Sequence, residues 1–265
     1  MPLQIAIVQF QPQRKRVLSN INEIRSLLDG FKADLVVLPE LANTGYLYES
    51  RDELHPFSEP KDGQGEFLSA MSEIAKDIGG MIVTGYAEKQ GDRLFNSAAA
   101  VNSDGLVANY RKIHLYADEK LLFEPGNLGF TIFDLKDVKK GMMICFDWIF
   151  PESARSLALK GAQIIAHPAN LVLPYCQEAM ITRSIENKVF TITANRIGKE
   201  ELADQELAFT GVSQITNPRG EVLFRGPKDK ATVHILSIDP DEALDKRISE
   251  RNDLFSDRRS EFYTI

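Results

Sequence analysis

The stretch Gly141-Met142-Met143-Ile144-Cys145-Phe146-Asp147-Trp148-Ile149-Phe150-Pro151-Glu152 decides the fold and the chemistry. Its apolar first half predicts a buried strand, and Pro151 predicts the first turn of a helix. Cys145 therefore follows the carboxyl end of a strand, where α/β proteins open into a ligand-binding crevice. A thiol there is either a nucleophile or a small buried apolar group, the commoner role of cysteine.

Sequence on both sides of this stretch indicates an α/β protein. Residues 3–10 and the apolar run 34–38 are predicted strands, with a helix between them at 17–28. Residues 161–168 repeat the character of residues 32–39, and residues 189–194 correspond to residues 81–86. The chain thus reads as two β-α-β halves in one domain spanning 1–265, with residues 246–265 as an exposed, charged C-terminal arm.

Composition narrows the functional classes. The chain has 265 residues with 43% hydrophobic content, enough to bury a large core. Its net charge of −7 argues against a nucleic-acid partner, and no apolar run is long enough for a membrane span. The absence of a recognisable signal peptide and the presence of only two cysteines, Cys145 and Cys176, predict a reducing, cytoplasmic setting. The four histidines lack metal-ligand spacing, so we expect neither metal nor cofactor.

Two further reactive residues stand, like Cys145, where an apolar run gives way to a loop. Glu40 follows Leu38-Pro39, and Lys112 follows the second arm of a hairpin predicted over residues 96–110. Each residue alone has an ordinary structural explanation. Together, a carboxylate, an ammonium and a thiol are the groups that acyl transfer from a carbon–nitrogen bond requires.

These blocks resemble the signatures of the nitrilase superfamily, the carbon–nitrogen hydrolases. The resemblance rests on Leu38-Pro39-Glu40, on Tyr110-Arg111-Lys112-Ile113-His114-Leu115, and on Ile144-Cys145-Phe146-Asp147 with Phe150-Pro151-Glu152. It continues through Arg183-Ser184-Ile185-Glu186-Asn187, where we expect a supporting ion-pair network. The resemblance implies a four-layer α-β-β-α sandwich with pseudo-twofold halves, and a homodimer or higher homo-oligomer, often with exchanged C-terminal arms.

The side chains suggest a role for each residue. Glu40 is expected to act as general base, because a free cysteine is mostly protonated at neutral pH. Lys112, with the backbone N–H of Phe146, is expected to stabilise the oxyanion that forms when Cys145 attacks. Glu119 resembles a second glutamate of the family that positions substrate or Lys112. The predicted pocket wall consists of Tyr46, Phe146, Trp148 and Asn170.

Other functions remain open on the sequence alone. A cysteine protease would use His114 or His167 as its base, and a non-catalytic scaffold would keep the fold without turnover. Within the family, the run Cys145-Phe146-Asp147-Trp148 resembles amidases and some small nitrilases, and it lacks the Arg-Arg of typical N-carbamoyl amino-acid hydrolases. We expect a small aliphatic amide or nitrile as substrate, with an N-carbamoyl amide as the alternative.

Overall fold

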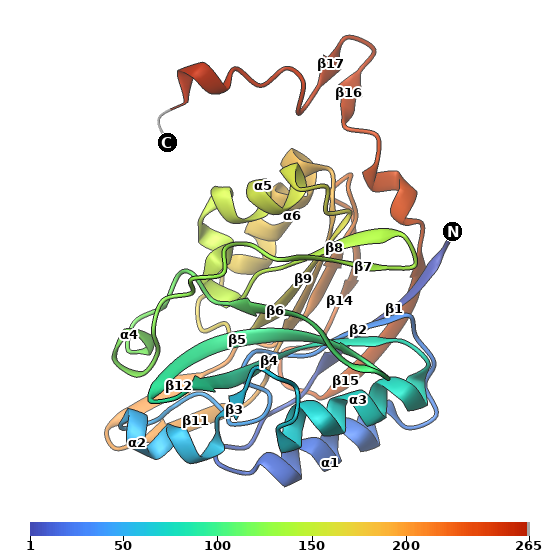
Figure 1. The fold of residues 1–265 in the computed structure, drawn as a ribbon. Coiled ribbons are helices and arrows are strands. Elements are labelled where there is room, and N and C mark those ends of the chain that lie inside the picture. The colour runs from blue at the N-terminus through green and yellow to red at the C-terminus, as the bar shows by residue number, and fades with distance from the viewer. Residues whose placement is uncertain (264–265) are drawn as a thin grey trace.

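The computed structural model describes residues 1–263 and contains two large β-sheets packed face to face (Figure 1). The first sheet has the strand order β15-β1-β2-β4-β5-β6, with β3 paired to β4. Its strands are β1 (Leu3–Gln9), β2 (Leu35–Val37), β3 (Glu59–Pro60), β4 (Met81–Gln90), β5 (Arg93–Asn102), β6 (Gly105–Arg111) and β15 (Thr232–Ile238).

The second sheet has the order β14-β13-β10-β9-β8-β7. Its strands are β7 (Ile132–Leu135), β8 (Val138–Met142), β9 (Ile164–Ala169), β10 (Phe190–Asn195), β13 (Gln214–Thr216) and β14 (Val222–Arg225). Two small hairpins stand apart from both sheets, β11 (Lys199–Leu202) with β12 (Gln205–Ala208), and β16 (Arg247–Ser249) with β17 (Asn252–Asp253).

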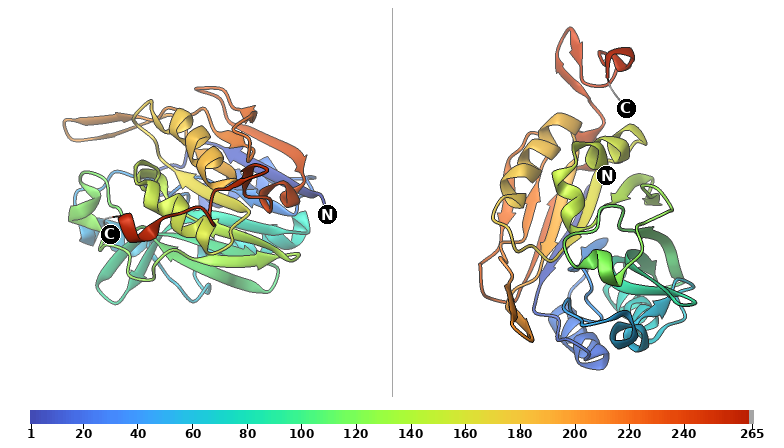
Figure 2. Two further views of the ribbon diagram at one scale, coloured as in Figure 1. Left: turned by 90° about the horizontal axis from the view of Figure 1, so that it is seen from above. Right: turned by 90° about the vertical axis from the view of Figure 1, so that its left-hand side faces the viewer.

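Helices form the outer layers. The α-helices are α1 (Val17–Leu28), α2 (Arg51–Leu54), α3 (Glu66–Ile78), α4 (Glu119–Leu122), α5 (Pro151–Leu159) and α6 (Cys176–Asn187). Short 3₁₀ turns lie at η1 (His55–Phe57), η2 (Cys145–Ile149), η3 (Pro240–Ala243) and η4 (Ser260–Phe262). Helices α1 and α3 cover the first sheet, and α5 and α6 cover the second, so that the layers run α-β-β-α (Figures 1 and 2).

The side chains of β1 are buried on both faces of the strand. Ile5 and Ile7 point into the core between the two sheets, while Ala6 and Val8 join the core beneath α1 and α3. Successive side chains of a strand point to opposite faces, so a strand covered on both sides is mostly apolar. Residues 5–8 show this pattern, whereas Gln4 near the start of the strand is exposed and Gln9 at its end is buried and polar.

The two halves are related by a pseudo-twofold arrangement, as predicted. Parallel strands β1-β2-β4 form the centre of one sheet, and parallel strands β8-β9-β10 form the centre of the other. In each sheet two antiparallel strands follow the third central strand, and one antiparallel strand pairs with the first. The predicted four-layer α/β sandwich is confirmed.

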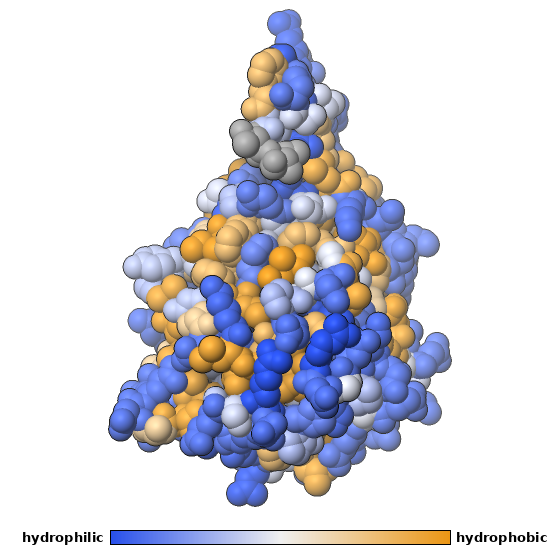
Figure 3. All heavy atoms as spheres, turned by 60° about the vertical axis from the view of Figure 1, so that its left-hand side comes forward, coloured by the Kyte–Doolittle hydropathy of each residue, from blue (hydrophilic) through white to orange (hydrophobic). Residues whose placement is uncertain are grey.

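The C-terminal segment from residue 246 carries the small hairpin β16-β17 and the turn η4, and it projects from the body beyond α5 and α6 (Figure 1). The space-filling view shows apolar and polar side chains interspersed on the face below this projection (Figure 3). Residues 264–265 of the predicted arm lie outside the described residues. Within residues 1–263, no helix combines the length and apolar character of a membrane span.

Three local details concern segments that the sequence analysis singled out. Glu119 begins the short helix α4, and Cys176 is the first residue of α6. Strand β9 continues through Pro168 to Ala169. Proline removes one backbone donor from a ladder but leaves its carbonyl free to accept, and the neighbouring parallel strand β10 continues alongside.

Candidate active site

Cys145 lies at a sharp turn between β8 and α5. Its φ of +41° places this residue in the left-handed region, which residues other than glycine seldom occupy. The residue is 6% exposed, so the turn presents the thiol at a narrow opening. Strain of this kind is retained where surrounding contacts enforce it, and it is concentrated at functional sites.

Asp147 holds this turn in place. Its carboxylate accepts hydrogen bonds from the backbone N–H of Ile144 (2.8 Å) and the hydroxyl of Tyr110 (2.8 Å), and it pairs with Nδ1 of His114 (2.7 Å). Asp147 is fully buried. The carboxylate thus ties the nucleophile turn to the segment that follows β6.

Glu40 follows β2 and is fully buried. Its Oε1 accepts hydrogen bonds from Nζ of Lys112 (2.7 Å) and Nδ2 of Asn96 (2.7 Å), whereas its Oε2 is buried without a partner. The backbone of Glu40 presses against β4 at Gly85, where an added Cβ would lie 2.3 Å from the Cα of Glu40. Glycine at position 85 is therefore required for this close approach.

Lys112 directly follows β6, and its ammonium lies between two carboxylates. Nζ donates to Oε1 of Glu40 and to Oε1 of Glu119, each at 2.7 Å. Burial lowers the pKa of Lys112, but the negative charges of Glu119 and Glu40 outweigh this effect, so the pKa lies above its ordinary value. Lys112 is consequently charged at neutral pH and cannot serve as a base.

Glu119 is the second carboxylate on Lys112. Its Oε1 also accepts the hydroxyl of Tyr46 (2.8 Å), and its Oε2 accepts the backbone N–H of Tyr116 (3.2 Å). Burial raises the pKa of Glu119 and is opposed by the charge of Lys112. Glu119 therefore has its acceptor positions occupied, in contrast to Glu40.

The electrostatics favour a protonated thiol in the resting protein. Burial, and then the charge of Glu40, raise the pKa of Cys145 well above its ordinary value. Lys112 and a hydrogen bond from the backbone N–H of Asn170 act in the opposite direction without reversing the shift. A neighbouring base must therefore remove the proton when the thiol attacks.

The space directly beside Cys145 is small. Its volume of about 10 Å³ leaves room for about one water. The residues around it are Tyr116, Cys145, Phe146, Trp148, Asn170, Leu171, Val172 and Leu173. Three of the four residues predicted for the pocket wall line this space: Phe146, Trp148 and Asn170. The fourth, Tyr46, contacts Glu119 and is not among the lining residues. Both polar atoms of the Asn170 amide are buried without a partner.

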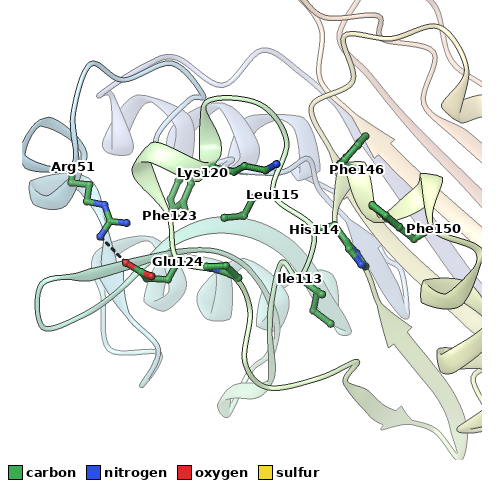
Figure 4. A pocket seen from close by; sticks show the side chains of 10 residues that line it. Arg51, Ile113, His114, Leu115, Lys120, Phe123, Glu124, Phe146 and Phe150 are labelled. Carbon is green, nitrogen blue, oxygen red and sulfur yellow. Dashed lines mark hydrogen bonds and ion pairs between the residues drawn. The ribbon is translucent and has the colours of Figure 1, made fainter. Parts of the chain in front are cut away.

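A larger pocket of about 470 Å³ is also lined by Phe146, which therefore borders both spaces (Figure 4). His114 and Phe150 line this pocket with their rings stacked 3.8 Å apart, and the ion pair between Arg51 and Glu124 lies at its far side (2.7 Å). The small space beside Cys145 therefore has a wider neighbour that opens toward solvent.

Two groups of side chains support the site. Asn96 was not identified from the sequence, whereas the network around Arg183 was expected. Asn96, on strand β5, donates to Glu40, and nothing in the sequence around it distinguishes it from other polar residues in strands. The network expected around Arg183 is present, because Nη1 of Arg183 contacts Glu186 (3.0 Å) and Nε donates to the carbonyl of Trp148 (3.2 Å). Helix α6 thereby braces the end of the nucleophile turn.

His167 does not act on the thiol. One ring nitrogen bonds to the backbone carbonyl of Cys145 (3.0 Å) and the other to the hydroxyl of Thr193 (3.0 Å). Burial lowers the pKa of His167 to about 4, so the ring is neutral at physiological pH. No group of three or more potential metal ligands occurs in the part of the chain that the structure describes.

The buried His167 predicts a pH dependence of stability. Below pH 6.5 the unfolded imidazole takes up a proton, but the folded one does so only near pH 4, so stability falls as the pH is lowered. The loss from this group between pH 6.5 and pH 4 is about 3 kcal/mol. Urea unfolding of the original protein and of His167→Gln at several pH values measures it. An equal acid loss in both proteins would contradict this source.

A buried cysteine on a strained turn, beside a carboxylate and an ammonium on an α-β-β-α sandwich, defines a class of cysteine-dependent hydrolases. The family model described as carbon–nitrogen hydrolase matches residues 3–247. A nitrilase from Pyrococcus abyssi is 47% identical over 98% of this chain and 99% of its own length. A stereoselective amidase from a Pseudomonas species is 31% identical over 85% of this chain and 80% of its own.

Solved structures agree with the sequence matches. The crystal structure of a carbon–nitrogen hydrolase from Helicobacter pylori superposes with a TM-score of 0.83 and 26% identity, covering 99% of this chain and 97% of that one. The chain belongs to the carbon–nitrogen hydrolase family, the nitrilase superfamily, and is a carbon–nitrogen hydrolase.

Proposed function

We propose that this enzyme hydrolyses the carbon–nitrogen bond of a small aliphatic amide or nitrile to a carboxylic acid and ammonia, through a thioester on Cys145. The main support for this proposal is that the two carboxylate oxygens of Glu40 differ. Oε1 accepts two hydrogen bonds, whereas Oε2 is buried without a partner. A buried carboxylate with a free oxygen, whose charge acts on a protonated thiol, is suited to serve as a general base.

The proposed reaction begins when Glu40 takes the thiol proton as sulfur attacks the substrate carbon. With an amide, the oxyanion is stabilised by Lys112 and the backbone N–H of Phe146, and Glu40 passes the proton to the departing ammonia. Water, activated by Glu40, then cleaves the thioester and releases the acid. With a nitrile, attack gives a thioimidate; water adds to its carbon, and ammonia then leaves to give the same thioester.

The space beside Cys145 is small and its walls are largely apolar, which favours a small acyl group over a large one. It shares Phe146 with the larger pocket. The names of the two relatives given above, one a nitrilase and one an amidase, support both substrate types. A panel of short amides and nitriles, assayed for ammonia and for an acyl adduct on the peptide spanning 142–155, tests the proposal. No ammonia and no adduct from any member would contradict it.

Substitution of Lys112 tests the oxyanion role. We expect Lys112→Ala to lower kcat by about 10²–10³-fold with little change in KM, because this contact strengthens as charge develops. The variant leaves Glu40 and Glu119 facing each other, so its stability should fall by about 3–5 kcal/mol, and kinetics must be measured below its melting midpoint. Lys76→Ala, an exposed lysine on α3, is the control. A change confined to KM would rule out the role.

Asn170 is proposed as a substrate-binding residue. Its amide is buried without a partner, so a polar group of the substrate would satisfy it. We expect Asn170→Ala to raise KM about tenfold, the value of one hydrogen bond, with no loss of melting temperature because no internal bond is broken. Steady-state kinetics and thermal unfolding measure the two effects. An unchanged KM with lower stability would indicate a purely structural residue.

We also propose a cytoplasmic homodimer or higher homo-oligomer consisting of one carbon–nitrogen hydrolase domain with residues 246–265 as an arm. Both cysteines are free, which suits a reducing compartment. The projecting segment exposes Ile248 and Phe262, which a second copy would cover. Sedimentation of the full chain and of a chain ending at residue 245 tests the assembly. Identical monomeric behaviour of both would exclude it.

A further inference from the structure

The hairpin β11-β12 places a buried carboxylate against the loop that follows Glu40. Glu200, on β11, accepts hydrogen bonds from the backbone N–H groups of Tyr46 (3.0 Å) and Leu47 (2.7 Å). The loop lies very close to this carboxylate, because an added Cβ at Gly45 would lie 2.9 Å from Oε1 of Glu200. Gly45 has a φ of +76°, so the turn itself requires glycine.

A buried cation fixes Glu200 in turn. Nη1 of Arg196 pairs with Glu200, and Nη2 donates to the carbonyl of Pro12 (3.1 Å). The guanidinium lies 4.0 Å from the ring centre of Phe209, and that ring meets the ring of Tyr46 edge to face at 5.9 Å. Tyr46 is thus held at its backbone by Glu200 and at its ring by Phe209.

The hydroxyl of Tyr46 reaches the proposed catalytic cluster. It donates to Oε1 of Glu119 (2.8 Å), the same oxygen that accepts Nζ of Lys112. Burial, and then the charges of Glu119 and Glu40, raise the pKa of Tyr46 well above its ordinary value, so the phenol remains a donor. The direction of this donor decides where the carboxylate of Glu119 holds the ammonium.

We propose that Glu200 is a positioning residue, which fixes the loop of Tyr46 so that the phenol orients Glu119 and, through it, Lys112. The inference rests on the proposed function, and nothing in it requires Glu200 to touch substrate. In this proposal Glu200 affects Lys112 only through Tyr46. Loss of Tyr46's hydroxyl should therefore remove most of the effect of changing Glu200.

A double-mutant cycle of Glu200→Gln and Tyr46→Phe tests this route. We expect each single variant to lower kcat about tenfold, and Glu200→Gln to change kcat less than twofold in the Tyr46→Phe background. Glu201→Gln, the adjacent exposed glutamate on the same strand, is the control and should leave kcat unchanged. Independent effects that multiply, or an unchanged kcat in Glu200→Gln, would overturn the proposal.

A second double-mutant cycle needs no substrate. It compares the rates at which iodoacetamide alkylates Cys145 in the same variants, measured by mass spectrometry. The charges of Lys112 and Glu119 both affect the pKa of the Cys145 thiol. A variant in which these two side chains move should therefore alkylate at a different rate. If the effects of the two substitutions on the alkylation rate are non-additive but no substrate releases ammonia, the positioning role of Glu200 stands and the proposed function fails. Multiplying effects would overturn the role. Should Glu200→Gln not fold, Glu200→Asp retains the charge opposite Arg196 and enters the same cycles with the same criteria.

Discussion

Cys145→Ala is expected to release no detectable ammonia from any amide or nitrile that the original protein hydrolyses. The methyl group cannot form a thioester, and the proposed mechanism has no second nucleophile. The fold should survive, because the substitution removes one sulfur atom at the end of a strand and breaks no ion pair. Ammonia assays measure the first effect, and circular dichroism with thermal unfolding measures the second.

The second cysteine supplies a matched control. Cys176 begins α6, is fully buried, and does not line the space beside Cys145. Cys176→Ala should therefore keep kcat within about twofold while losing about 1 kcal/mol of stability, as an ordinary small core change does. Turnover by Cys145→Ala close to that of Cys176→Ala would remove the central assignment.

Glu40→Gln is expected to lower kcat by about 10²–10⁴-fold, the usual contribution of a general base. Glutamine preserves the shape and can still accept from Lys112 and Asn96, but it cannot take the proton of a thiol whose pKa is raised. Alkylation of Cys145 at pH 7 should not slow in parallel, because loss of the Glu40 charge removes one of the causes that raise the pKa of the thiol. Both rates are measured on purified protein.

Glu49→Gln is the comparison for this experiment, because Glu49 is exposed on the same connection between β2 and α2. Its kcat and alkylation rate should match those of the original protein. If Glu40→Gln kept kcat within tenfold, Glu40 would not be the base, and the unpartnered Oε2 would need another explanation.

The convergence of the reactive residues could be predicted because each follows a strand. Glu40 follows β2, Lys112 follows β6 and Cys145 follows β8, and sequence shows both the apolar runs and the breaks after them. The face-to-face packing of the two sheets brings the ends of these three strands to one region of the sandwich. The sequence also showed the repeat from which the two halves were inferred.

The supporting residues could not be predicted, because their roles depend on partners distant in the chain. Asn96 lies 56 residues from Glu40, and Glu200 lies 154 residues from Tyr46. A polar residue in a strand or hairpin is ordinarily solvated, and nothing in its immediate neighbours distinguishes these. The sequence analysis expects Tyr46 at the pocket wall, whereas its hydroxyl contact with Glu119 depends on the geometry of the loop that carries it.

The pseudo-twofold arrangement divides the proposed chemistry between two pieces of the protein. Glu40 and Lys112 come from the sheet built around β1-β2-β4, and Cys145 comes from the sheet built around β8-β9-β10. A newly synthesised chain with only its first half in place would carry the base without the sulfur. The proposed chemistry therefore requires that both repeats have folded and packed against each other, because neither repeat alone carries all three groups.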